Sequence, residues 1–294
     1  MHFLIALIID GCLAGAIYAL IALAFVLVYK ASRVVNLALG EWVMLGALLV
    51  ATAMNVGGLG LAESLVAAFG GMIALAWIFD LVALRHLVGR PLIAALMVTL
   101  GVGTFIRGTT QIGFAHVPRS ILSPFPTDPY LLGEIVIPAD RLWAGAIALL
   151  VVAGIAWLYR RSRTGVALRA IADDVQAAMA AGIDTSRHVL IAWGSAGVVA
   201  AIGGVLWTFV TGGGFGVGLV GLKIFPIVII GGLDSIAGAL VAAVLIGVLE
   251  SLAAGYLEPY LGAGCSLLVT YLALIAMLLV RPHGLFGEVK VARV

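Results

Sequence analysis

The amino-acid sequence predicts an all-α fold, a polytopic transmembrane helical bundle of about 8–9 spans that includes a broken or re-entrant helix. Composition is the first reason, because 64% of the 294 residues are hydrophobic and only 10% are charged. Soluble domains carry about 25% charged residues, so a soluble fold is not expected. Hydropathy is the second reason, since its mean is +1.24. The third is a series of apolar runs near the roughly 20 residues that cross a bilayer.

The apolar runs predict the spans in chain order. They cover residues 3–29, 42–56, 62–84, 91–114, 142–159, 189–211, 236–256 and 261–280. A further run at residues 224–233 is short for a span.

Basic residues near the ends of the runs predict the orientation. The connection 160–188 is rich in arginine, and the turn 85–90 is also basic. We expect both at the cytoplasmic face, together with the tail. The basic residues of the turn and the tail are Arg85, Arg90, Arg281, Lys290 and Arg293.

The segment 115–141 contains five prolines and is expected to be an ordered, non-helical external loop. The N-terminus is then outside and the C-terminus cytoplasmic. An odd number of crossings must join them, so either residues 224–233 cross the membrane or a neighbouring helix is broken and re-entrant.

The residues between the first two runs interrupt the apolar pattern. Asn36, Gly40 and Glu41 lie in an otherwise apolar stretch. One interpretation is a re-entrant break whose freed backbone groups line a polar cavity. The other is an ordinary cytoplasmic connection, with Glu41 at a helix N-terminus where its charge suits the helix dipole. The sequence leaves both open.

A second interruption surrounds the short run. It contains Lys223, Pro226 and the pair Gly231 and Gly232. Proline and paired glycines in so short a run favour a broken helix that lines a cavity. The alternative is a short helix that ends in a double-glycine turn.

Residues 166–180 predict an amphipathic helix within the arginine-rich connection. Ile171, Val175 and Met179 recur every fourth residue and form an apolar stripe. Gly182 is expected to end this helix. Such a helix either lies on the membrane or inserts its alanine-rich face into a groove on a partner protein.

Single polar residues are weaker signals. Asp10, Arg107 and Glu250 could line a pathway, although Asp10 and Glu250 could equally lie near span ends and reach the interface.

Glycine pairs point to helix packing. Glycine is abundant, at 38 residues, and allows transmembrane helices to approach closely. The spacings of Gly11 with Gly15 and of Gly212 with Gly216 are typical of such packing.

The sequence predicts no chemistry of its own. It contains neither a GxxxxGK[ST] phosphate loop nor an HExxH motif, and its histidines are scattered. Cys12 and Cys265 form no CxxC pair. We therefore expect no enzyme, no catalytic residue, no metal, no cofactor and no nucleic-acid partner.

Several stretches of the chain match a known family in order and spacing. They are residues 15–24, 35–41, 163–183, 223–239 and the close at 281–288. Through them the chain resembles, over nearly its whole length, the permease subunits of bacterial branched-chain amino-acid ABC importers, in their H-type branch. The resemblance implies a single transmembrane permease domain over residues 1–294 in the bacterial inner (plasma) membrane, with a coupling loop at 160–188.

The resemblance also implies partners and sites. The partners are two cytosolic ATP-binding subunits, a second related permease subunit and a periplasmic or extracellular solute-binding protein, all working in membrane lipid. The substrate pathway is expected at Asn36, Gly40, Glu41, Lys223, Gly231 and Gly232. Coupling to the ATP-binding subunit is expected at Asp173, Asp174, Ala177, Ala178, Gly182 and Ile183.

Two departures from the family pattern bear on these expectations. Gln176 stands where the coupling motif Glu-Ala-Ala…Gly has its glutamate. The family's Asn-Phe-Ala-His-Gly-Glu motif has Leu37 and Leu39 here in place of phenylalanine and histidine. Branched-chain amino acids are the default cargo, and urea, short amides, or aromatic or dicarboxylic acids are the alternatives. An ATP-independent secondary transporter or channel is the alternative from another class.

Overall fold

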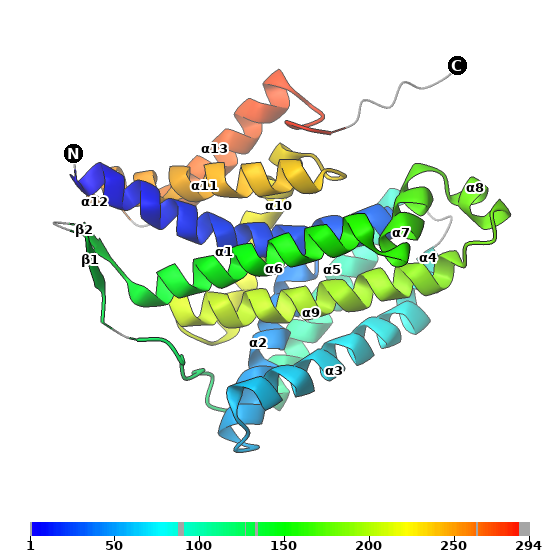
Figure 1. Cartoon of the computed structure of the whole chain (residues 1–294), viewed down its shortest axis with the longest axis horizontal. Coiled ribbons are helices and arrows are strands. Elements are labelled where there is room, and N and C mark those ends of the chain that lie inside the picture. The colour runs from blue at the N-terminus through cyan, green and yellow to red at the C-terminus, as the bar shows by residue number, and fades with distance from the viewer. Residues whose placement is uncertain (1, 88–90, 127, 133–134, 263, 288–294) are drawn as a thin grey trace.

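The structure, a computed structural model, describes residues 2–87, 91–126, 128–132, 135–262 and 264–287 (Figure 1). Arg90, Glu288, Lys290 and Arg293 lie outside the described residues. Nearly all elements are helical, as predicted. In chain order they are α1 (His2–Ser32), α2 (Leu39–Asn55), α3 (Leu61–Phe79), the π-helix η1 (Asp80–Leu84), α4 (Arg85–Leu87), α5 (Leu92–Gly113), β1 (Tyr130–Leu132), β2 (Ile135–Ile137), α6 (Ala139–Arg161), α7 (Arg163–Asp173), α8 (Val175–Ala180), α9 (Thr185–Thr211), the 3₁₀ helix η2 (Phe215–Leu219), α10 (Val220–Gly231), α11 (Ile236–Tyr256), α12 (Glu258–Leu261) and α13 (Cys265–Val280).

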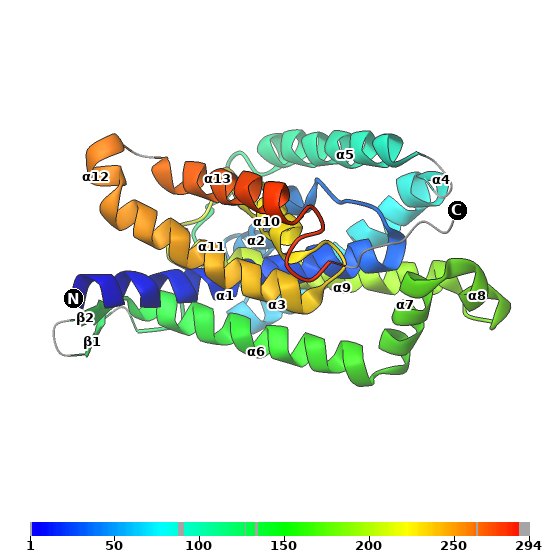
Figure 2. The same cartoon turned by 90° about the horizontal axis from the view of Figure 1, so that it is seen from above.

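Within the described residues, 6 helical segments are long and apolar enough to cross a membrane. They are α1, α5, α6, α9, α11 and the continuous segment Leu61–Leu87, which comprises α3, η1 and α4. The apolar helices α2, η2 with α10, and α13 are shorter. Each predicted run therefore corresponds to a helix. Helices α1, α6, α9 and α11 run roughly along the long axis of the molecule, whereas α5 is steeply inclined to it; α7 and α8 lie at one end and the N-terminus and the β1–β2 hairpin at the other (Figures 1 and 2).

The segment 115–141, predicted to be a non-helical external loop, has no regular secondary structure in its described residues before Tyr130 and then forms a small hairpin. Strands β1 and β2 pair antiparallel, with Tyr130 opposite Ile137. Helix α6 begins at Ala139, slightly before the predicted boundary.

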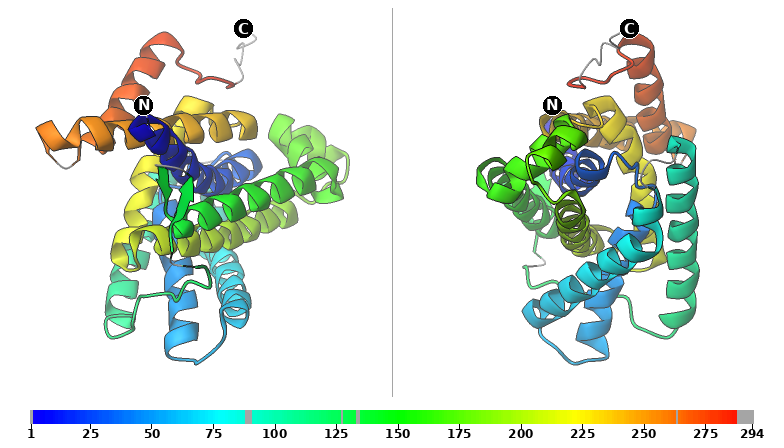
Figure 3. Two further views of the ribbon diagram at one scale, coloured as in Figure 1. Left: turned by 60° about the vertical axis from the view of Figure 1, so that its left-hand side comes forward. Right: turned by 90° about the vertical axis from the view of Figure 1, so that its right-hand side faces the viewer.

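Helix α1 is the centre of the bundle. It contacts α6, α9 and α11, and a view along its axis shows it surrounded by other helices (Figure 3, right). A Cβ atom on Gly11 would lie 2.5 Å from Cα of Val248, and one on Gly247 would lie 2.4 Å from the carbonyl oxygen of Gly11. Only glycine allows the backbones of α1 and α11 to come this close. The packing role predicted for the Gly11–Gly15 spacing is confirmed.

The same expectation for the second glycine pair is wrong. Gly212 ends α9 with φ 83°, and Gly216 lies in η2 with no atom packed within 4 Å of the position of its missing Cβ. The pair lies beyond the last residue of α9, so its spacing does not fall on a helix face.

The chain turns back into the bundle after α1. Arg33 adopts φ 54°, and its N–H donates to the carbonyl of Tyr29 at 2.8 Å. Residues 34–38 then run, without helix, back toward the middle of the bundle, where α2 begins (Figure 2). Asn36 is 2% exposed and Ala38 is 1% exposed, so the segment is buried. This geometry is the re-entrant break and not the surface connection, although Glu41 does lie in the first turn of α2.

The break expected within the second interruption is absent. Helix α10 continues through Pro226 and ends in a double-glycine turn, in which Gly232 has φ 103°. Proline cannot donate to the carbonyl of Leu222 one turn earlier. The hydroxyl of Tyr271, on α13, donates to that carbonyl instead at 3.0 Å. A backbone acceptor in a membrane must be satisfied within the protein, and this contact from a distant helix removes the reason for a break.

The single amphipathic helix predicted over residues 166–180 is also wrong. Asp174 adopts an extended conformation (φ −152°, ψ 111°) and separates α7 from α8. Its carboxylate caps α8 by accepting from the N–H groups of Gln176 and Ala177 at 2.8 and 3.0 Å. The expected stripe is therefore divided, with Ile171 buried and Met179 exposed.

The contact between α1 and α11 provides a test of the packing. Gly247→Ala is expected to lower stability by about 1–3 kcal/mol, since the new methyl group overlaps the backbone of α1. Gly101→Ala is the matched control, because nothing lies within 4 Å of a Cβ at that exposed position of α5. Thermal melting of both purified variants in one detergent measures the difference. Equal melting temperatures would refute the packing role.

Candidate functional site

An ion pair connects α2 to α5 at the edge of the bundle. Arg107 donates to Oε1 of Glu41 through Nη2 at 2.7 Å and through Nε at 3.2 Å. The side chain of Glu41 is 15% exposed and that of Arg107 is 35% exposed. Charged side chains within membrane segments pair with one another or face a water-filled cavity. This pair does both, because it lines a cavity.

The cavity has a volume of about 390 Å³ and lies between α2, α5, η2, α10 and α13. Its wall is largely apolar, apart from the ion pair and the hydroxyl groups of Thr104 and Tyr271. The apolar side chains are Leu37, Leu100, Leu219, Leu222 and Phe225. A much smaller cavity of about 20 Å³ lies beside it, lined by Asn36, Leu39 and Gly40 among others.

Asn36 holds the re-entrant segment in place. Its Oδ1 accepts from the N–H of Ala38 at 3.1 Å. Thr99 of α5 donates to the carbonyl of Val35 at 3.2 Å and accepts from the N–H of Leu37 at 3.4 Å. These side chains form hydrogen bonds with backbone groups that have no partner within a helix. Backbone groups inside a membrane need such partners, because no water is present to supply them. Asn36 thus shapes the cavity wall from behind.

Gly40 lies where α2 crosses η2 and α10. A Cβ atom on Gly40 would lie 2.2 Å from the carbonyl oxygen of Gly218, and one on Gly221 would lie 2.8 Å from Cα of Gly40. The glycine therefore sets how closely these elements approach, and so where the neighbouring Glu41 carboxylate lies.

Lys223 belongs to a separate buried cluster. Its Nζ lies 2.8 Å from Oε2 of Glu250, which also accepts from the hydroxyl of Tyr18 at 2.8 Å. The hydroxyl of Thr270 donates to the other oxygen of Glu250 at 2.7 Å. Both oxygens of Glu250 are thus occupied by protein groups. The cluster ties together α1, α10, α11 and α13.

Gly231 and Gly232 pack against other backbone segments. A Cβ atom on Gly231 would lie 2.5 Å from the carbonyl carbon of Gly238, and one on Gly232 would lie 2.7 Å from the amide nitrogen of Gly287. The N–H of Phe286 donates to the carbonyl of Gly231 at 3.1 Å. The double glycine makes room for the chain after α13, and neither glycine lines the 390 Å³ cavity.

The residues expected to couple to a partner form a compact turn at one end of the bundle. Asp173, Asp174, Ala177 and Gly182 are exposed, Ile183 is half-buried, and Ala178 is buried. Gly182 has φ 82°. Its N–H donates to the carbonyl of Met179, and that of Ile183 to the carbonyl of Ala178, both at 3.0 Å. This is a Schellman motif, in which a left-handed glycine closes the helix. Helix α8 therefore presents Ala177 and its exposed neighbours outward.

Arg33 connects that end to the re-entrant segment. Its Nη2 donates to the carbonyl of Ala172 at 2.5 Å, at the end of α7, and its guanidinium lies 5.7 Å from the centre of the Tyr29 ring. One residue thus contacts the last turn of α7 and begins the segment that leads to Asn36 and Glu41.

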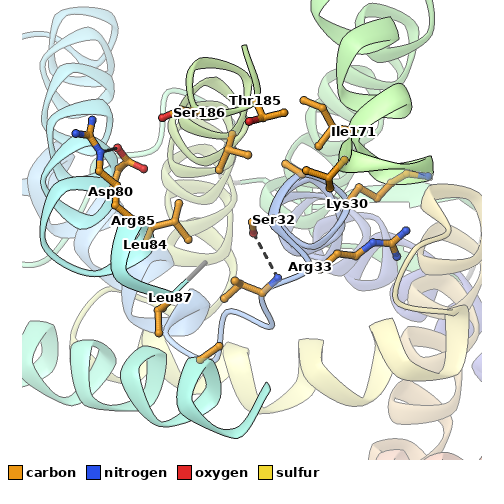
Figure 4. Close-up of a pocket in the computed structure, with 15 residues that line it drawn as sticks. Lys30, Ser32, Arg33, Asp80, Leu84, Arg85, Leu87, Ile171, Thr185 and Ser186 are labelled. Carbon is orange, nitrogen blue, oxygen red and sulfur yellow. Dashed lines mark hydrogen bonds and ion pairs between the residues drawn. The ribbon is translucent and has the colours of Figure 1, made fainter. Parts of the chain in front are cut away.

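A second large cavity, of about 470 Å³, lies at the same end between α1, η1, α4, α7 and α9 (Figure 4). Its charged residues are already engaged. Lys30 donates to the carbonyl of Asp234 at 2.9 Å, and Arg85 pairs with Asp80 at 2.8 Å. Figure 4 shows Lys30 and Arg33 extending away from the Asp80–Arg85 pair.

Sequence reasoning gave little weight to several of these residues. Arg107 and Glu250 were visible as charges in apolar runs, but their partners lie 66 and 27 residues away in sequence. Asp10 pairs with Arg141, at the start of α6. Within the described residues, no group of three or more His, Cys, Asp or Glu side chains could hold a metal ion.

Comparison with known proteins shows what the chain is similar to. A family model described as "Branched-chain amino acid transport system / permease component" matches residues 7–280. The high-affinity branched-chain amino acid transport system permease protein BraD of Pseudomonas aeruginosa is 29% identical over 98% of this chain and 97% of its own. The corresponding protein LivH of Escherichia coli is 28% identical, over 97% and 96%. A probable branched-chain amino acid transport permease protein LivH of Methanocaldococcus jannaschii is 27% identical, over 96% and 92%.

Removing the cation from the buried cluster around Glu250 is expected to reduce the stability of the bundle. Lys223→Met is expected to lower stability by about 3–5 kcal/mol, because it leaves the carboxylate of Glu250 buried without its cation. The double variant Lys223→Met/Glu250→Gln removes both charges and is expected to regain most of the loss. Thermal melting of the purified variants measures both effects. If the single and double variants melt at the same temperature, the pair does not stabilise the bundle in this way.

Proposed function

The chain belongs to the family of branched-chain amino acid transport system permease components, and we propose that it forms the membrane pathway of a binding-protein-dependent ABC importer. It is a multi-pass inner-membrane protein with helices that can span the bilayer. Like its relatives it is a transport subunit. The proposed cargo is a branched-chain or related amino acid, and residues 1–294 act as one permease domain.

The proposed importer needs other subunits. Two cytosolic ATP-binding subunits hydrolyse ATP, a second related permease completes the pathway, and an external solute-binding protein delivers the cargo. The structural observation that carries this proposal is α8, a short capped helix that extends from one end of the bundle beside α7 (Figure 1).

The surface of α8 suits a protein partner. Val175 is 45% exposed and Met179 is 51% exposed, one turn apart on one face of α8, and Ala177 is exposed on another face with only a methyl group. Apolar side chains on a helix outside the membrane are stabilised by insertion into a groove. A small exposed residue allows a partner to approach the helix closely, so Ala177 is the proposed point of close approach to the ATP-binding subunit.

The charges favour the α7–α8 end as the cytoplasmic one. The arginines there include Arg160 and Arg161 at the end of α6 and Arg163 at the start of α7. Basic residues flanking membrane spans accumulate on the cytoplasmic side. The N-terminus and the β1–β2 hairpin, at the other end of the bundle (Figure 1), are then external.

The cavity lining supports the amino-acid default. Leu37, which replaces the family phenylalanine, lines the 390 Å³ cavity. Leu39, which replaces the histidine, is 3% exposed and lies in the core beside it. The histidine replacement therefore changes the packing behind the cavity more than its wall. Urea, amides, and aromatic or dicarboxylic acids remain the alternative cargoes that an uptake assay compares.

The coupling surface can be tested with one exposed residue. Ala177→Arg is expected to abolish both ATP-driven uptake and co-purification with the ATP-binding subunits, because a bulky charge replaces the small methyl group at the proposed point of close approach. Uptake into proteoliposomes and pull-down from membranes measure the two effects. Leu122→Arg, exposed at the opposite end of the bundle, is the control expected to retain both. Transport by the chain without any ATP-binding subunit would instead indicate a secondary transporter or channel.

Arg33 is the proposed connection between α7 and the pathway. Arg33→Ala is expected to reduce uptake roughly tenfold relative to ATP hydrolysis, as for loss of one charge-assisted hydrogen bond. Arg33→Gly relieves the positive φ but also lacks the guanidinium, so it is expected to behave in the same way. Uptake and hydrolysis are measured on the same proteoliposomes. Equal loss of both activities would show that Arg33 has no part in coupling.

A further inference from the structure

The ion pair between Glu41 and Arg107 is incomplete, unlike the cluster around Glu250. Only Oε1 of Glu41 accepts from Arg107, and only Nη2 and Nε of Arg107 donate. Among the described residues no protein group bonds Oε2 of Glu41 or Nη1 of Arg107. The pair therefore leaves one oxygen of Glu41 and one nitrogen of Arg107 without a protein partner beside the cavity.

The free groups have opposite charge and belong to one ion pair that lines the cavity. A guanidinium binds carboxylates through directed N–H groups, and a carboxylate accepts from an ammonium group. A molecule that carries both an ammonium and a carboxylate group on one carbon can satisfy both at once. A molecule with only one of these groups leaves a charge of the pair unmatched.

The rest of the cavity suits an aliphatic side chain. Leu37, Leu100, Leu222 and Phe225 line it together with the ion pair. Its volume of about 390 Å³ is within the range of small-molecule sites. Charged groups are costly within a membrane and tend to mark substrate pathways.

We propose that Glu41 and Arg107 form an amino-acid site within the permease itself, in which Arg107 binds the α-carboxylate, Glu41 binds the α-ammonium group and the leucine-rich wall holds a branched aliphatic side chain. This inference rests on the proposed importer function and deepens it, since it gives the permease its own selection of cargo after the solute-binding protein has released it.

A binding experiment on the whole importer, without the solute-binding protein, tests the site. Three probes are compared: L-leucine, 3-methylbutylamine, which lacks the carboxylate, and 4-methylpentanoate, which lacks the ammonium group. L-leucine is expected to bind at least roughly tenfold more tightly than either analogue, because each analogue loses a charge-assisted hydrogen bond. Scintillation proximity measurements with labelled leucine and unlabelled competitors give the affinities.

Two single variants test which residue binds the ammonium group of leucine and which binds its carboxylate. Glu41→Gln is expected to weaken leucine binding roughly tenfold or more and to remove the preference for leucine over 4-methylpentanoate. Arg107→Gln is expected to remove the preference over 3-methylbutylamine. Arg141→Gln is the control, because Arg141 pairs with Asp10 away from the cavity, and it is expected to bind leucine like the unchanged protein.

An exchanged pair separates binding from a purely structural role. Glu41→Arg/Arg107→Glu keeps an ion pair between α2 and α5, so a structural role predicts that it restores both melting temperature and leucine binding. The proposed site predicts that only the melting temperature is restored. Leucine binding that is restored in the exchanged variant, or that is unchanged in Glu41→Gln and Arg107→Gln, would overturn the site. If the importer with the unchanged sequence shows no ATP-driven uptake at all, the proposed function is wrong instead.

Discussion

The contact between α1 and α11 is so close that only glycine fits. Gly11 and Gly247 lie at each other's backbones, and the lipid surrounding the bundle offers no hydrophobic drive that could hold these helices together. Close van der Waals contact replaces that drive. This contact affects the rest of the bundle, because α1 lies at its centre with α6 and α9 also packed on it. The re-entrant segment that follows α1, and the position of α2 after it, depend on where that central helix ends.

The carboxylates of Glu250 and Glu41 show how differently a membrane protein can use a charge. Glu250 has both oxygens occupied, by Lys223 and Tyr18 on one side and Thr270 on the other. Such a cluster holds helices together, and the oxygens of Glu250 are not available to a ligand. Glu41 has one oxygen engaged by Arg107 and faces a cavity. Since an unmatched polar group in a low-dielectric site is costly, an incomplete pair gains from a ligand that completes it. The two carboxylates differ in the number of their partners and in exposure, which is 8% for the Glu250 side chain and 15% for that of Glu41.

Helical structure is interrupted at two places, after α1 and after α7, and each interruption has its own structural role. After α1, Thr99 and Asn36 supply the hydrogen bonds that the extended chain lacks, so irregular backbone survives inside the bundle. After α7, the carboxylate of Asp174 caps α8 and turns it outward. Arg33 contacts both regions, through its own backbone and through the carbonyl of Ala172. Arg33 therefore connects the end of α7 to the segment that leads to the wall of the cavity.

The sequence by itself determined the class, the order of the apolar helices, the family resemblance and the polar positions at Asn36 and Glu41, because hydropathy and helix-breaking residues act locally. It also predicted that Gly11 and Gly15 lie in a helix contact. Only the tertiary structure decided that Pro226 leaves α10 unbroken, since the hydroxyl that replaces the missing N–H comes from Tyr271 on another helix. Only it decided that Lys223 is neutralised by Glu250 while Glu41 keeps a free oxygen. Partners from distant parts of the chain leave no local pattern, because their pairing depends on how the helices pack.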